Sequence, residues 1–239
     1  ACGNSRTPPG DAPAAATGLL IRGLEVLQSI QSVDNSVRLI ADKATVVRIY
    51  VNPTNVESHG LVTGELTWRH SGAGFSYLPA MNRVEVAQAQ RPTLQEQRFD
   101  LTQSINFRLP PEAVSEGKLE LKVKRLYVPG GSDIPLVGTP ALEVEFRRAP
   151  VLRVRAIGLR YKDATAAGGA VTPDALHFNF LRSYLLRAYP VAALEWSQLV
   201  VDADLLEPPF GQDASDLANA QLAAIRAREV SSGRDPRTH

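Results

Sequence analysis

Two patterns of apolar and polar positions divide the chain near residue 150. Before that point, apolar residues alternate with polar ones over short runs, which is the period of a half-buried β-strand. In residues 44–51, for example, Val47, Ile49 and Val51 alternate with Arg48 and Tyr50. After that point, strand-like runs alternate with longer stretches of helical period. The pattern predicts an all-β first part and a mixed second part.

The first part contains about seven short strand-like runs separated by turn residues, an arrangement typical of an Ig-like β-sandwich. The clearest runs are residues 19–28, 44–51, 61–68, 104–109, 119–126 and 141–146, with shorter ones around 84–86 and 99–101. A single helical turn is predicted at residues 111–114. Because each run has one apolar and one polar face, we expect sheets with one side in water. The sandwich is predicted to span residues 19–149.

Trp68 ends a run in which Val62, Gly64 and Leu66 share its face. A tryptophan on the inward face of such a strand is a core anchor. The alternative is an exposed aromatic side chain that binds a sugar. The shared apolar face favours the core position.

The second part reads strand, helix, strand, helix. Residues 151–159 and 194–201 have strand character, and Thr172-Pro173-Asp174 carries the residues that begin a helix. Helical spacing then gives one apolar stripe made of Leu176, Phe180, Leu181, Tyr184, Leu185 and Ala188. A second helix is predicted over residues 216–230. This order favours an α/β layer whose strands lie parallel.

Two strands and two helices bury little apolar surface by themselves. We therefore expect residues 150–239 to form a partial α/β domain. The expected partner is either a missing C-terminal portion of the same protein or another protein chain. A formal net charge of +1 over 239 residues excludes the basic surface typical of nucleic-acid-binding proteins.

The N-terminal residues 1–18 predict a flexible tether rich in Pro, Ala and Gly. Cys2 is the only cysteine, so no disulfide can form within the chain. A cysteine followed by such a tether is typical of a mature bacterial lipoprotein, with Ala1 as the last residue of the lipobox, and Cys2 is therefore a candidate lipidation site. The alternative is an incidental cysteine in an exported tail. Both interpretations predict an extracellular or periplasmic location, and lipidation predicts attachment to a membrane.

The chemistry-bearing residues form no complete catalytic pattern. The four histidines (His59, His70, His177 and His239) have none of the spacings of zinc motifs. His177 lies beside the apolar stripe and is predicted to be a partly buried structural residue. Asp202 and Asp204 could offer two carboxylates to a calcium ion, although an acidic loop is the simpler interpretation. No catalytic, cofactor-binding or metal-binding residue is predicted.

Three stretches resemble known proteins. Residues 23–31, Gly-Leu-Glu-Val-Leu-Gln-Ser-Ile-Gln, and residues 39–51 resemble the opening of Ig-like domains in large secreted bacterial proteins. Residues 178–190, 218–226 and 235–239 resemble the segment that follows in some of them, where it opens a metzincin-like zinc metallopeptidase domain. In that family the His-Glu-x-x-His zinc motif lies further along the chain. The resemblance implies that zinc belongs only to a longer parent protein.

Two functions are consistent with these patterns. The first is a non-catalytic N-terminal portion of a secreted or surface-anchored zinc metallopeptidase, whose active site lies beyond this chain. The alternative is an extracellular structural or adhesion module that forms part of a larger cell-envelope assembly. In both cases we expect this chain alone to be inactive.

Overall fold

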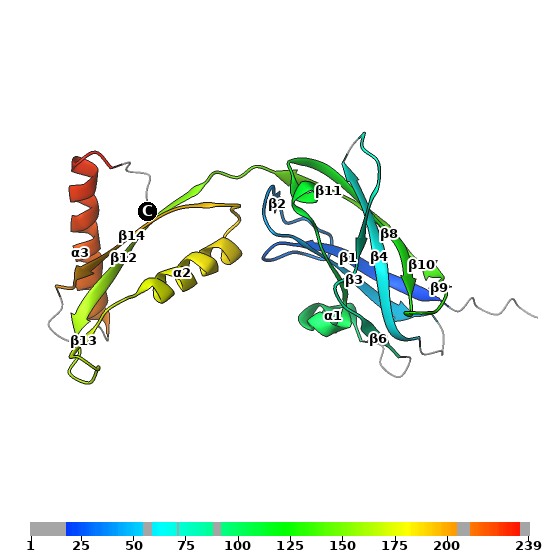
Figure 1. Cartoon of the computed structure of the whole chain (residues 1–239), viewed down its shortest axis with the longest axis horizontal. Coiled ribbons are helices and arrows are strands. Elements are labelled where there is room, and N and C mark those ends of the chain that lie inside the picture. Colours follow the sequence, from blue (N-terminus) through cyan, green and yellow to red (C-terminus); the bar gives the residue numbers. More distant parts are fainter. Residues whose placement is uncertain (1–17, 55–58, 71, 88–91, 205–210, 235–239) are drawn as a thin grey trace, which may run out of the picture. The chain divides into compact units, whose positions relative to one another are not determined.

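The computed structural model describes residues 18–54, 59–70, 72–87, 92–204 and 211–234 (Figure 1). The described chain is predominantly β, as the alternating pattern predicts. It divides into two compact units, residues 1–147 and 148–239.

The first unit contains a four-stranded sheet in the order β10-β1-β3-β7. Strand β1 pairs with β3 and β3 with β7 in antiparallel register, whereas β10 runs parallel to β1. The four strands are β1 (Leu19–Leu27), β3 (Val46–Pro53), β7 (Ile105–Arg108) and β10 (Leu136–Val137).

A seven-stranded sheet completes this unit, with the order β2-β11-β8-β4-β5 and two further strands at its side: β6 pairs with β4, and β9 pairs with β8. The longest strands, β4 and β8, are antiparallel neighbours with a register shift between Glu65 and Leu66. The strands are β2 (Leu39–Ile40), β4 (Gly60–His70), β5 (Ser76–Pro79), β6 (Val84–Val86), β8 (Gly117–Tyr127), β9 (Asp133–Ile134) and β11 (Ala141–Arg147).

The apolar faces of the two sheets share one core. Val47 and Ile49 of β3 are fully buried there, together with Leu66 of β4. Trp68 lies at the edge of the same core with 9% of its surface exposed. This burial confirms Trp68 as a core residue and contradicts the sugar-binding alternative.

The outer face of the four-stranded sheet departs from the prediction of a solvated side. Arg48 and Tyr50 point away from the core, yet they are 4% and 1% exposed. The segment that follows β6 covers them with α1 (Leu94–Phe99) and the 3₁₀ turn η1 (Leu101–Gln103). The strand predicted around residues 99–101 is therefore wrong. Residues 111–114 form the predicted turn as η2 (Pro111–Val114).

A capping box explains why α1 begins where it does. The backbone N–H of Glu96 donates to the Thr93 hydroxyl at 3.2 Å, and the backbone N–H of Thr93 donates to the Glu96 carboxylate at 2.7 Å. Two otherwise unpaired amide groups are satisfied in this way. The short pattern Thr-x-x-Glu therefore outweighs the weak strand signal that follows it.

The second unit contains a parallel strand pair with helices. Strand β12 (Leu152–Lys162) lies parallel to β14 (Leu194–Asp202) over nine register positions, which confirms the predicted parallel order. Helix α2 (Ala175–Ala188) connects them, and α3 (Gln212–Ser231) follows β14. The two-residue strand β13 (Ala170–Val171) pairs with the end of β12.

Helices α2 and α3 lie on opposite faces of this strand pair (Figure 1). The side chain of Arg155 on β12 reaches Glu229 on α3 at 2.8 Å. Gly158 has the opposite parity on the strand and faces Phe178 of α2, where an added Cβ would come within 2.9 Å of the ring. Since successive strand residues point to opposite faces, the two contacts place one helix on each face.

Candidate functional site

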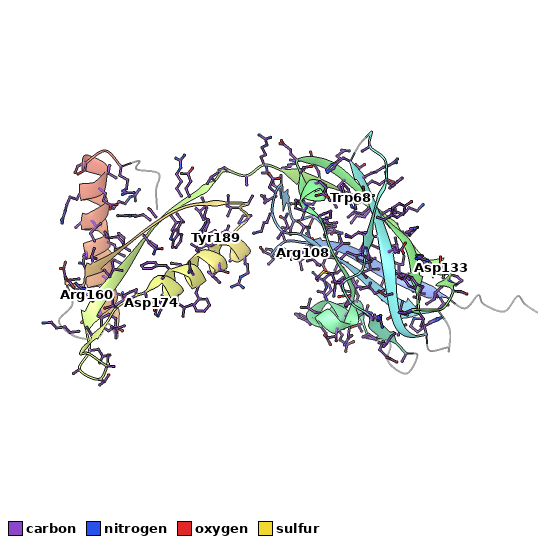
Figure 2. The ribbon with its side chains drawn as sticks, in the orientation of Figure 1. Trp68, Arg108, Asp133, Arg160, Asp174 and Tyr189 are labelled. Carbon is purple, nitrogen blue, oxygen red and sulfur yellow. The ribbon has the colours of Figure 1, made fainter. Side chains whose placement is uncertain are left out.

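Helix α2 carries an apolar row on the side that faces away from the strands. Leu176, Phe180 and Tyr184 follow one another at a spacing of four residues and are 56%, 64% and 58% exposed. We call these three residues the α2 outer face. Asp174 and Tyr189 mark the two ends of the helix in Figure 2. Phe178, on another side of the helix, packs against the strands and is only 6% exposed.

The predicted apolar stripe thus exists, but most of it does not face the sheet. Of its six members only Leu185 is half-buried in the second unit. A helix that is apolar both toward its own sheet and away from it is typical of a helix enclosed on both sides. The α2 outer face is therefore the strongest candidate for a protein-binding surface in the described part of the chain.

Both edges of the parallel pair are largely unpaired among the described residues. Strand β14 pairs with β12 alone, and the second edge of β12 pairs with β13 only at Tyr161 and Lys162. The N–H and C=O groups along such an edge can accept an added strand. Each edge is therefore a second feature that favours contact with further polypeptide.

The second unit also buries few apolar side chains. Ala156 and Phe178 are its only buried apolar residues in the described ranges, whereas the first unit encloses a core that spans two sheets. Phe180 and Tyr184 would each bury a large aromatic surface on contact with another apolar face. The unit consequently has more apolar surface to bury than its own elements cover.

Two arginine side chains on β12 are paired with acidic residues of β14. Arg153 lies 2.7 Å from Glu195, and Arg160 lies 2.6 Å from Asp202. Both pairs are exposed, so they contribute little to stability. Because the two arginines are neutralised within the unit, apolar contact and backbone pairing are the stronger means of recognition at this surface.

His177 has a structural role, but it is not partly buried as predicted. Its side chain is 68% exposed and its Nδ1 atom lies 2.6 Å from the Asp174 carboxylate. Asp174 is the N-cap of α2 and accepts hydrogen bonds from the backbone N–H groups of Leu176 and His177. The bonds from His177 lower the pKa of the Asp174 carboxyl group. The histidine pairs with the N-cap of α2, and the next residue, Phe178, is the one that packs on β12.

Asp202 and Asp204 lie where β14 ends, but they do not act together. The Asp202 carboxylate is engaged by Arg160, which lowers its pKa. The backbone N–H of Asp204 donates to the Gln221 side chain, whose amide group donates in turn to the backbone carbonyl of Asp202. The simpler interpretation, an acidic loop fixed to α3, describes this arrangement.

The described residues do not assemble a zinc site. No three His, Cys, Asp or Glu side chains gather as metal ligands in those ranges, so the zinc that the resemblance implies has no residue assigned to it here. His70 instead contacts the backbone carbonyls of Lys118 and Glu112. Cys2, the candidate lipidation site, and His239 lie outside the described residues.

None of the described helices is long and apolar enough to cross a membrane. Comparison with known proteins adds no further assignment: no family model, no curated protein and no solved structure matches the chain.

Proposed function

We propose that this chain is a non-catalytic portion of a secreted or surface-anchored bacterial zinc metallopeptidase. In this proposal an Ig-like β-sandwich, residues 19–149, precedes a partial α/β domain, residues 150–239. The peptidase active site lies in another part of the same protein. The chain contributes the sandwich and the first strands and helices of the catalytic domain.

The α2 outer face is the observation that carries this proposal. Leu176, Phe180 and Tyr184 are large apolar side chains, and each is more than half exposed. Covering a side chain of this size stabilises a protein by about 1.5–3 kcal/mol. Further polypeptide packed against α2 would recover this free energy. An added strand on the edge of β12 or β14 would also satisfy backbone groups that β13 leaves unpaired.

The occupant that we propose is the remainder of the peptidase domain. Residues 178–190, which carry the resemblance to that family, lie on α2 itself and just after it. Residues 218–226, the second such stretch, lie within α3. The resemblance thus falls on the two helices of the unit whose apolar surface is incompletely covered.

The second candidate function is a structural or adhesive subunit of a cell-envelope assembly. The open strand edges favour it, because a strand from a separate chain can pair there as well as one from the same chain. In this case the α2 outer face would be covered by a partner subunit. Lipidation of Cys2 would hold such an assembly at a membrane.

Antibodies against this chain can identify the native protein in envelope and culture-medium fractions. We expect a band far larger than the 25.9 kDa of the chain, with tryptic peptides from this sequence and from a His-Glu-x-x-His segment. A band of the chain's own mass that co-purifies with a second protein in fixed ratio would contradict the peptidase proposal and support the assembly. A free monomer of that mass would contradict both.

A further inference from the structure

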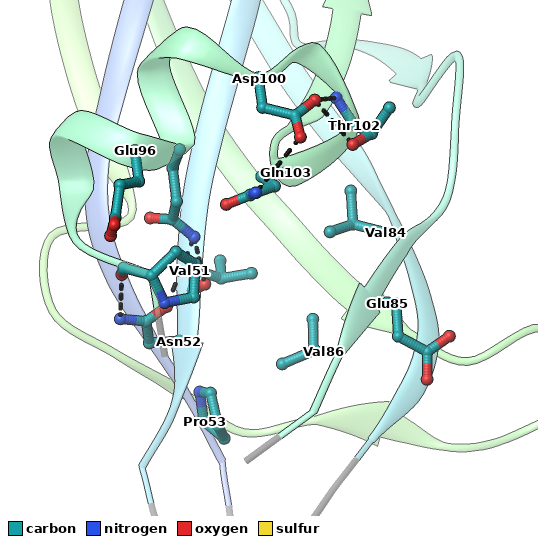
Figure 3. A pocket seen from close by; sticks show the side chains of 12 residues that line it. Val51, Asn52, Pro53, Val84, Glu85, Val86, Glu96, Asp100, Thr102 and Gln103 are labelled. Atoms are coloured by element: carbon teal, nitrogen blue, oxygen red, sulfur yellow. Dashed lines mark hydrogen bonds between the residues drawn. The ribbon is translucent and has the colours of Figure 1, made fainter. Parts of the chain in front are cut away.

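A cavity of about 710 Å³ lies in the first unit, outside the surface used by the proposed function. It lies between the end of β3, strand β6 and the α1–η1 segment (Figure 3). Val51, Val84 and Val86 form apolar parts of its wall. Figure 3 shows Val84 and Val86 on one side of β6, with Glu85 directed to the other side. The cavity could therefore hold the apolar body of a small molecule.

Two buried amide oxygens in this wall have no hydrogen-bond partner. Gln97 is 3% exposed, and its Nε2 atom donates to the backbone carbonyl of Val51 at 2.9 Å, which leaves its Oε1 atom without a donor. The Nε2 atom of Gln103 donates to the Asp100 carboxylate at 3.2 Å, and its Oε1 atom is likewise unpaired (Figure 3). A buried acceptor without a partner destabilises a protein, because nothing compensates for the loss of its hydration.

The orientation of both amides is fixed by the groups that accept from their Nε2 atoms. Rotating either side chain to reverse its oxygen and nitrogen would break a hydrogen bond to Val51 or to Asp100. Both oxygens therefore remain acceptors, which an N–H or O–H donor of a ligand, or of a water that the ligand displaces, can satisfy. Since they are shielded from bulk water, a donor that reaches them forms a strong bond.

The charge around the cavity selects among such donors. Among the described residues, its lining includes the acidic side chains of Glu96 and Asp100 and no lysine or arginine. Hydrogen bonds from the Thr102 hydroxyl and backbone N–H lower the pKa of Asp100 and keep it ionised. An anion would be repelled by this lining, whereas a cation would be attracted.

We propose that this cavity binds a small organic cation, in which an ammonium or amidinium group donates hydrogen bonds to Gln97 and Gln103 while an apolar body packs on the valines of β3 and β6. The site is independent of the α2 outer face and of peptidase activity.

Three planar compounds of similar size test the proposal on the whole chain: benzamidine, benzamide and benzoate, which carry positive, zero and negative charge. In NMR titrations of the isotope-labelled chain, benzamidine should shift the side-chain amide signals of Gln97 and Gln103 and the methyl signals of Val84 and Val86. Its affinity should exceed that of benzamide by about tenfold, because a charged donor forms a stronger hydrogen bond to a buried acceptor than a neutral donor does. Benzoate that binds as well as benzamidine, or shifts confined to other residues, would overturn the proposal.

A variant separates the amide contact from general attraction to acidic residues. Gln103→Met keeps the length of the side chain, removes its oxygen and should weaken benzamidine binding by about tenfold. Gln198→Met, in the second unit, removes an amide that accepts from Trp196 and should leave binding unchanged. Equal affinities of the two variants would contradict the role of Gln103. Circular dichroism checks that both variants are folded. If the Gln103→Met variant does not fold, the ranking of the three compounds on the unaltered chain decides the proposal.

Discussion

The guanidinium group of Arg98 donates to the carboxylate of Glu25 at 2.8 Å and so joins α1 to β1 across the outer face of the four-stranded sheet. Glu25 is 3% exposed and also accepts a hydrogen bond from the hydroxyl group of Tyr50. Burial of the hydroxyl group raises the pKa of Tyr50, and the hydrogen bond to Glu25 raises it further. Arg48 completes the cluster by donating to the backbone carbonyls of Gln97 and Arg98. These bonds hold the α1–η1 segment, which forms one side of the cavity.

Replacing Arg98 by methionine should lower the free energy of unfolding by about 3–5 kcal/mol, because the Glu25 carboxylate would remain buried without its cationic partner. With Trp196→Phe in the background, urea unfolding monitored by the fluorescence of Trp68 measures this change in the first unit. The matched control is Arg69→Met, because Arg69 also forms an ion pair with a glutamate, Glu120, at 2.7 Å, but both side chains of that pair are exposed. That control should cost about 0.2–1 kcal/mol. Equal losses would show that burial of Glu25 contributes nothing.

The ion pairs of Glu65 should make the stability of the first unit depend on pH. Hydrogen bonds from Arg125, which has the larger effect, and from Lys124 lower the pKa of its carboxyl group from 4.5 to about 2. A carboxyl group whose pKa is lower in the folded state stabilises the fold above its unfolded pKa and loses that contribution as the pH falls through its folded pKa. The difference in stability between the unaltered chain and Glu65→Gln should therefore shrink between pH 4.5 and about pH 2. A difference that stays constant over this range would contradict the assigned pairing.

Gly158 should tolerate no side chain. An added Cβ would lie 2.9 Å from the ring of Phe178 and 3.0 Å from two atoms of Pro173, so Gly158→Ala should destabilise the second unit by about 1–3 kcal/mol. With Trp68→Phe in the background, Trp196 is the only tryptophan and reports unfolding of that unit. Gly74→Ala is the control, since no atom lies within 4 Å of the added Cβ; it lies in the first unit, so its unfolding is followed by Trp68 with Trp196→Phe in the background. An unchanged midpoint for Gly158→Ala would mean that α2 does not pack on β12 as described.

The N-cap of α2 should be worth about 1 kcal/mol, the typical cost of replacing a capping aspartate by alanine. Asp174→Ala removes the acceptor for the N–H groups of Leu176 and His177, at 2.9 and 3.2 Å. Asp174→Ser, which can still accept, should restore most of the loss. The same Trp196 signal measures both variants, and a serine variant as unstable as the alanine variant would argue against the cap.

The alternating pattern of the sequence predicts a strand and its core face, but not what covers the other face. In β3 the alternation of Val47, Ile49 and Val51 identifies the core face correctly. It cannot show that Arg48 and Tyr50 are buried as well. The partners of Arg48 lie in α1 and the partner of Tyr50 is Glu25 of β1, and these groups meet only in the folded chain. The two faces of β3 therefore differ in chemistry rather than in exposure.

The sequence likewise predicts only part of the candidate sites. Helical spacing correctly groups Leu176, Phe180 and Tyr184 on one stripe, but spacing does not say whether that stripe meets the helix's own sheet or another surface. No sequence signal marks Gln97 and Gln103 either. A glutamine oxygen that lacks a donor is recognised only when the partner of its Nε2 atom is known.

We propose that further polypeptide covers the α2 outer face in the native protein. Hydroxyl-radical footprinting of the full-length gene product, compared with this chain alone, measures the exposure of Leu176, Phe180 and Tyr184 directly. All three should be oxidised in the isolated chain and protected in the full-length protein, while exposed Tyr77 of the first unit should be oxidised equally in both. Equal oxidation of the three residues in the two samples would contradict it.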